Sequence, residues 1–222
     1  MILIIDENKQ RRDTLCETFY YIGLLPLSAC EQSARDILSP AVKAVIISEP
    51  SELANAEGLI ISIRQGFSNL PIFVISDSPL TASQEALIAG KFSSGVYAAD
   101  LVEGIINYQI ANGLCPLGKY MLAGLDAGCD LGSVRYLSRE VALTKTETMI
   151  VRYLIASYPT PRSAREILLG AYKPTKRPEE AAVRTQISLI NRKFAELKSE
   201  RLIARTDNGY ILLTPDVVAN KI

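Results

Sequence analysis

Two polar residues, Ser48 and Glu49, directly follow the apolar run 44–47 and could do chemistry at the end of a buried strand. In open sheets built from alternating strands and helices, reactive groups lie at the carboxyl ends of the strands. A serine hydroxyl, however, needs a base to remove its proton before it can act as a nucleophile. The sequence contains no histidine, which excludes a histidine-based triad. These residues alone leave open whether the strand end reacts or is only where a strand stops.

A second group of polar residues lies on a predicted helix near the C-terminus. In AAVRTQISLINRKFAEL, apolar residues recur at spacings of 4, 3, 4 and 3 and form one stripe for a domain core: Val183, Ile187, Ile190, Phe194 and Leu197. The opposite face and its flank are polar and free of acid: Thr185, Ser188, Arg192, Arg184 and Asn191. Reading base edges beside phosphates needs hydrogen-bond donors without negative charge. The alternative is an ordinary solvated face.

Basic residues near this helix favour nucleic acid over the solvated face. The preceding loop carries Lys173, Lys176 and Arg177. With Gln186 on the helix and Arg205 in the hairpin that follows, they complete the set of expected DNA contacts.

Composition limits the classes of protein that the chain can belong to. It has 222 residues, of which 48% are hydrophobic and 22% charged, as in soluble globular proteins. No run of about 18 apolar residues could span a membrane, and the N-terminus lacks the pattern of a signal peptide, so we expect a cytoplasmic protein. The cysteines are far apart and are expected to be free thiols: Cys16, Cys30, Cys115 and Cys129. Without histidine, a glycine-rich phosphate loop or clustered cysteines, no enzyme is expected.

The first half of the chain alternates short apolar runs with longer amphipathic ones. Strands are predicted at 2–5, 25–29, 44–47, 72–76 and 95–98, and helices near 9–22, 31–38, 52–66, 79–89 and 100–111. This alternation predicts a doubly wound, flavodoxin-like α/β domain with five parallel strands. We expect this domain to cover 1–112 and to be followed by a Gly/Pro-containing linker, 113–118.

The second half, 119–222, has a different pattern and a different charge. The first 112 residues carry 7 basic and 13 acidic residues, net −6, whereas the remainder carries 17 and 11, net +6. Short apolar runs over 119–142 predict a small antiparallel sheet. Capping boxes at Thr144–Glu147 and Ser163–Glu166 begin two helices, and the polar-faced helix is the third. A hairpin then turns at Asp207-Asn208-Gly209, so the order is that of a winged helix-turn-helix module.

The whole chain resembles OmpR/PhoB-type response regulators, in which a receiver domain precedes a winged-helix DNA-binding domain. The second half carries the more specific motifs, since ALTKTETMIVRYLI, SAREILLGAY, VRTQISLINRKF and ARTDNGYIL are similar to the family's first, second and recognition helices and its wing. The wing is shorter than the family's and lacks its turn arginine. Leu189 and Asn191 replace basic residues of the recognition helix.

The resemblance implies a receiver whose switch residues are replaced. Carried over position by position, the phosphoryl-accepting aspartate falls on Ser48, the conserved hydroxyl on Ser76 and the lysine on Tyr97. Asp6 and Glu7 occupy the place where receivers bind Mg²⁺. The pair is either a residual metal site or a solvated acidic strand end, and the second is expected because no third carboxylate joins it.

The expected function is that of a phosphorylation-independent DNA-binding transcriptional regulator. Its partners would be double-stranded promoter DNA, a second copy bound through the receiver-like domain, and RNA polymerase. One alternative is a conventional phospho-activated regulator that uses Glu49 or Ser48 as acceptor. Another is a module that binds protein instead of DNA.

Overall fold

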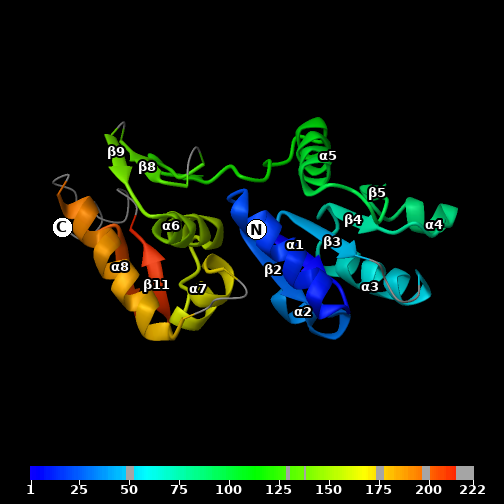
Figure 1. The fold of residues 1–222 in the computed structure, drawn as a ribbon, viewed down its shortest axis with the longest axis horizontal. Coiled ribbons are helices and arrows are strands. Elements are labelled where there is room, and N and C mark those ends of the chain that lie inside the picture. The colour runs from blue at the N-terminus through cyan, green and yellow to red at the C-terminus, as the bar shows by residue number, and fades with distance from the viewer. Residues whose placement is uncertain (49–52, 129–130, 138, 174–177, 197–200, 214–222) are drawn as a thin grey trace. The chain divides into compact units, whose positions relative to one another are not determined.

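The computed structural model describes residues 1–48, 53–128, 131–137, 139–173, 178–196 and 201–213 (Figure 1). The chain forms two compact units, Met1–Leu117 and Gly118–Ile222. Among the described residues, no helix has the length and apolar character needed to cross a membrane.

A five-stranded parallel sheet forms the centre of the first unit. Its strands are β1 (Ile2–Ile5), β2 (Pro26–Ala29), β3 (Ala44–Ser48), β4 (Ile72–Ile75) and β5 (Gly90–Phe92). They lie in the order β2-β1-β3-β4-β5, all parallel. This is the flavodoxin-like order of a doubly wound sheet, so the predicted fold class is confirmed.

Helices cover both faces of this sheet because its strands are apolar on both sides. One face packs against α2 (Ala34–Ile37), which follows the short helix η1 (Glu31–Ser33), and against α3 (Leu53–Gly66), with Leu59, Ile60 and Ile63 in the core. The other face packs against α1 (Lys9–Tyr21) and α5 (Ala98–Ala111), through Phe19 and Leu101 among others. Alternate residues of the three central strands β1, β3 and β4 supply the two cores, as a period of two requires.

The fifth strand lies five residues earlier than predicted, which corrects the expected strand at 95–98. Val96 and Tyr97 instead lead into α5, and Tyr97 is its N-cap residue. The strand was missed because β5 is an edge strand, where Gly90 and Lys91 are tolerated without an apolar run. The helix predicted at 79–89 is also shorter, since α4 covers only Ala82–Glu85.

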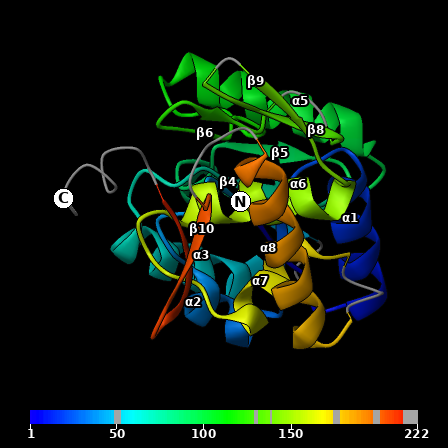
Figure 2. The ribbon, with the colours of Figure 1, turned by 90° about the vertical axis from the view of Figure 1, so that its left-hand side faces the viewer.

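The second unit begins with an antiparallel sheet, as predicted for 119–142. Its strands β6 (Met121–Leu122), β7 (Leu125–Asp126), β8 (Ser133–Tyr136) and β9 (Arg139–Ala142) are neighbours in chain order. Three helices follow: α6 (Lys145–Ser157), α7 (Ala164–Ala171) and α8 (Glu180–Ala195). The hairpin of β10 (Ile203–Thr206) and β11 (Gly209–Leu212) lies beside α8 (Figure 2). Three helices and a hairpin in this order form a winged helix-turn-helix, which confirms the prediction.

Local signals in the sequence set the starts of two of these helices. Thr144 and Glu147 form the predicted capping box of α6, and Ser163 and Glu166 form that of α7. The hairpin packs closely on the residues before α7, since a Cβ at Gly209 would lie 2.3 Å from the backbone oxygen of Arg162. Gly209 also has a φ of +129°. Glycine is therefore needed at this position both for its conformation and for the close approach.

Most of the expected linker, 113–118, belongs to the first unit, which extends to Leu117. Leu117 is buried, and its backbone N–H donates to the side chain of Gln109 at 2.8 Å. The same Gln109 side chain donates to the backbone oxygen of Lys43 at 2.8 Å. Gln109 thus ties the chain after α5 to the start of β3.

Candidate functional site

At the carboxyl edge of the first unit's sheet, Asp6 ends β1 and is almost fully buried, with 1% exposure. The Arg11 guanidinium grips both of its carboxylate oxygens, with Nε 2.5 Å from Oδ2 and Nη2 2.9 Å from Oδ1. The backbone N–H of Asn8 also donates to Oδ1, at 2.7 Å. This two-pronged pair is a strong form of charge-assisted hydrogen bond. The expectation of a solvated acidic pair is therefore wrong for Asp6.

Glu7, the second acidic residue, also has a partner within the chain. Its Oε1 accepts the backbone N–H of Glu31 at 2.7 Å, where η1 begins. Mg²⁺ would need carboxylate oxygens free to bind it. Arg11 already occupies the Asp6 carboxylate, and the described part of the chain gathers no group of three or more His, Cys, Asp or Glu side chains that could hold a metal. The residues of this edge do not fit a Mg²⁺ ion.

The expected acceptor and hydroxyl positions are buried serines. Ser48 ends β3 with 2% exposure, and Ser76 follows β4 with 7%. The Ser76 hydroxyl oxygen accepts the backbone N–H of Ser78 at 3.2 Å. Glu49, the alternative acceptor, lies outside the described residues.

Tyr97 does not occupy the position that the resemblance assigned to it. Because β5 ends at Phe92, the residues that directly follow the strand are Ser93 and Ser94, and Tyr97 is an N-cap residue with 78% exposure. The Ser94 backbone N–H donates to Asp77 at 3.0 Å. Hydrogen bonds from the side chain and then from the backbone of Ser94 hold the pKa of Asp77 below its usual value. Sequence reasoning also overlooked Lys91 within β5, whose Nζ donates to the backbone oxygen of Ser78 at 2.7 Å.

In the second unit, α8 has the two faces that the sequence predicted. Val183, Ile187, Ile190 and Phe194 are buried, whereas Leu197 lies outside the described residues. Thr185, Ser188, Arg192 and Arg184 are exposed, and Gln186 is half-buried. The Thr185 hydroxyl donates to the backbone oxygen of Ala181 at 3.3 Å, so it remains an acceptor for a ligand.

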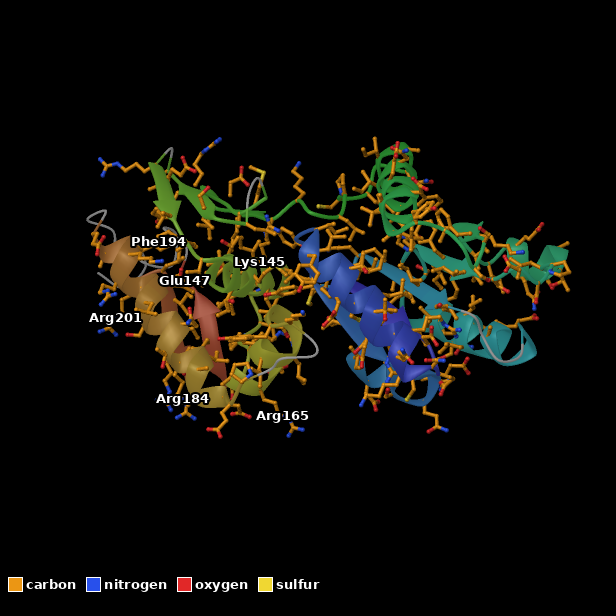
Figure 3. The ribbon with its side chains drawn as sticks, viewed as in Figure 1. Lys145, Glu147, Arg165, Arg184, Phe194 and Arg201 are labelled. Carbon is orange, nitrogen blue, oxygen red and sulfur yellow. The ribbon has the colours of Figure 1, made fainter. Side chains whose placement is uncertain are left out.

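A hollow of about 450 Å³ lies between α8 and the hairpin, and four arginines line it. Arg184 and Arg192 come from the helix, Arg201 from the residues before β10, and Arg205 from β10 itself. Figure 3 shows Arg184 and Arg201 along the same side of α8. Among the described residues, none of the four guanidinium groups has an ion pair or a hydrogen bond. Four like charges around one hollow attract a polyanion, whose own charges relieve their mutual repulsion.

Asn191 was predicted to contact DNA, but the structure gives its side chain another role. Its Nδ2 donates to the backbone oxygen of Ile203, and its Oδ1 accepts the backbone N–H of Ile203, both at 2.9 Å. The amide that would pair with a base edge is therefore bound to the hairpin. The sequence gave no sign of this, because the contact spans 12 positions and depends on how the hairpin folds back.

The other predicted contacts are placed in three ways. Arg205 is exposed on β10 and lines the hollow. Lys173 lies after α7, is half-buried and has an interaction within the chain. Lys176 and Arg177 lie outside the described residues. Arg201, which was not predicted, could have been found as a basic residue directly before the hairpin.

A partly buried ion pair fixes the opposite flank of α8 to α6. Lys193 Nζ lies 2.6 Å from Oε2 of Glu147, which is 1% exposed. Burial raises the pKa of Glu147, but the hydrogen bonds from Lys193 and Thr144 outweigh this and lower the pKa below its ordinary value. Lys193 therefore stabilises the fold, unlike the four arginines around the hollow.

Comparison with protein-family models found no match, and comparison with curated proteins found none. Among solved structures, the DNA-binding domain of the response regulator AdeR, in complex with an intercistronic region, is 21% identical and matches 43% of this chain and 99% of its own, with a TM-score of 0.38. A redox sensor of the streptococci, described as evolved from two-component response regulators, is 14% identical over 96% of this chain and 98% of its own, with a TM-score of 0.40. DrrB, an OmpR/PhoB homologue of Thermotoga maritima, is 13% identical over 95% and 97%, with a TM-score of 0.38.

All three are response regulators or descendants of them. Likeness at these identities and TM-scores carries no argument about what this chain does.

Proposed function

We propose that this protein is a DNA-binding transcriptional regulator, not an enzyme, and that its receiver-like unit works without phosphorylation. The observation that carries the first part is the hollow between α8 and the hairpin. Four arginines without a partner among the described residues line it, next to a helix face free of acid. A winged helix that places α8 in the major groove would bring the phosphate backbone to these arginines.

Duplex DNA binding by the full-length chain tests this part of the proposal. Fluorescence anisotropy with promoter duplexes from the gene's own genomic neighbourhood should give an affinity that falls steeply as salt increases. The reason is that arginines bound to phosphates displace the counterions condensed on the DNA. For substitutions of the four arginines around the hollow, the charge-matched control is Arg35→Ala, since Arg35 is an exposed arginine of the first unit. Absence of any binding at low salt would contradict the proposal. Capture of a protein partner by the same surface would then favour a protein-binding module.

Three observations support independence from phosphorylation. The β3 end carries a serine, Ser48, in place of an acidic acceptor. The residues that directly follow β5 are serines, so the lysine is missing there. Arg11 occupies the carboxylate that would face Mg²⁺. A hydroxyl without a base or a metal beside it is a poor phosphoryl acceptor.

We further propose that two copies of the chain associate through the α4-β5-α5 surface of the receiver-like unit. β5 is the edge strand of its sheet, and Ile110 of α5 is 61% exposed. A dimer would present two α8 helices to half-sites spaced by about one turn of DNA. Ile110→Glu should shift the mass measured by light scattering from dimer toward monomer, and an unchanged dimer would place the interface elsewhere. RNA polymerase is a further proposed partner, to be tested by co-purification on promoter DNA.

A further inference from the structure

Asn191 lies on the flank of α8 that faces the hairpin. Because a helix turns 100° per residue, this flank is between the buried stripe and the outer face. Ile203, its partner, is the first residue of β10, and both backbone groups of Ile203 bind the one amide. A half-buried asparagine in mid-helix thus forms a two-pronged clasp between helix and hairpin.

Asn191 and Ile203 line the same hollow as the four arginines. Along the hairpin, Arg201 and Arg205 stand two residues before and two residues after Ile203, and all three line the hollow. Alternate residues of an extended strand point to the same face, so fixing Ile203 also fixes the position from which Arg205 projects. Arg201 lies only two residues before Ile203, so its backbone is held close to the same point. On the helix, Arg192 is the direct neighbour of Asn191.

We propose that Asn191 is a positioning residue, which holds the hairpin arginines at a fixed distance from the helix arginines so that the hollow grips the phosphate backbone of DNA. This inference rests on the proposed DNA binding and adds to it. Asn191 does not pair bidentately with a base, because Ile203 already occupies the side of its amide where an N–H and an oxygen lone pair lie next to each other. The second N–H and the second lone pair of the amide point in different directions. Pre-organised arginines lose less conformational freedom on binding, which is how a residue that touches no DNA increases affinity.

A double-mutant cycle on the full chain separates positioning from contact. Asn191→Ala should weaken binding of a promoter duplex about tenfold, the effect of losing the two hydrogen bonds that hold the hairpin to α8. In the background of Arg201→Ala and Arg205→Ala the same change should cost less than about twofold, because no hairpin charge remains to be positioned. In the background of Thr185→Ala, on the other side of the helix, the tenfold loss should remain. An equal loss in all backgrounds would mean that Asn191 contacts DNA directly and would overturn the proposal.

Amide hydrogen exchange gives a second readout, which does not depend on DNA. Asn191→Ala should speed exchange of the Ile203 N–H and leave amides in the middle of α6 unchanged, because only the clasp has been lost. Weakened DNA binding without faster exchange at Ile203 would overturn the proposal.

A second variant keeps the test decisive if Asn191→Ala disturbs the helix. Asn191→Arg adds a positive charge but has no acceptor for the Ile203 N–H. Positioning predicts weaker binding despite the added charge, and tighter or equal binding would overturn it. If the wild-type chain binds no duplex at all, the proposed function fails. If it binds and the cycle is additive, only the role of Asn191 fails.

Discussion

Two polar regions of this protein, one in each unit, use their charges in opposite ways. At the carboxyl edge of the parallel sheet, Asp6 is held by Arg11 and Glu7 by a backbone N–H. Around the hollow beside α8, four arginines have no partner among the described residues. Burying a charge is costly unless it is paired, so the first region has been made part of the fold. Convergent unpaired charges cost stability, so the second is best explained by a ligand that supplies the opposite charge.

The resemblance to response regulators points to the opposite expectation for the first region. In that family the edge of the sheet is the reactive site and the acidic pair faces a metal. Here an arginine of the following helix takes the place of the cation. Acidic residues at the same edge of a similar fold therefore need not form a metal site, because their neighbours decide what they can bind.

The largest expected effect concerns the unpaired arginines. Arg192→Ala combined with Arg205→Ala should weaken duplex binding roughly 100-fold near 0.1 M salt and lower the salt slope by about two, since two phosphate contacts are lost. Anisotropy titrations at several salt concentrations measure both quantities. A salt slope that stays at the wild-type value would show that Arg192 and Arg205 do not bind phosphates, and that their lack of a partner in the fold has another cause.

The next effect tests the paired charges. Arg11→Ala leaves the buried Asp6 carboxylate without its counter-ion and should destabilise the chain by about 2 kcal/mol in urea unfolding, less than for a fully buried pair because Arg11 is partly exposed. Added Mg²⁺ should restore part of this loss in the variant and leave the wild type unchanged.

Lys9→Ala, an exposed change in the same helix, is the control and should respond to neither test. A wild-type protein that is stabilised by Mg²⁺ would show that Arg11 yields its place to the ion. The contrast between the two regions would then be lost.

A smaller effect tests whether a charge that is paired stabilises the fold in the second unit too, where the arginines around the hollow are unpaired. Glu147 of the second unit is buried and paired with Lys193, and its pKa is lowered in the fold. Glu147 should contribute about 1 kcal/mol to the free energy of unfolding. This contribution should be fully present above the pKa of the carboxyl group in the unfolded chain and lost as the pH falls through its lower pKa in the folded chain. Urea unfolding between pH 6 and about 3 should show this loss in the wild type and a smaller one in Glu147→Gln. An equal loss in both would assign the acid sensitivity to other carboxylates.

No effect at all is expected from a phosphoryl donor. Acetyl phosphate with Mg²⁺ should leave the mass, the oligomeric state and the DNA affinity of the wild type unchanged. Ser48→Asp should behave in the same way, because Arg11 still occupies Asp6 and no lysine directly follows β5. An added phosphoryl group in mass spectrometry of the wild type would restore the alternative in which Glu49 or Ser48 is the acceptor.

Local and periodic features of this fold could be predicted from the sequence. The capping boxes at Thr144 and Ser163 need only residues three positions apart, and the hairpin turn is a short-range signal. The buried stripe of α8 follows from a repeat within one helix. The strand at Gly90–Phe92 was missed because it is an edge strand, which pairs with one neighbour only and tolerates polar residues.

The sequence by itself determined the two units, the helix face free of acid and the presence of a serine at position 48, because each depends on residue type or short-range spacing. Only the tertiary structure decided which charges are free. Arg11 and Asp6 are five positions apart, but their pairing depends on how α1 packs at the end of β1. Asn191 meets Ile203 only when the hairpin folds back along α8. A polar side chain binds whichever partner the fold brings within hydrogen-bond distance, and a sequence does not list those distances.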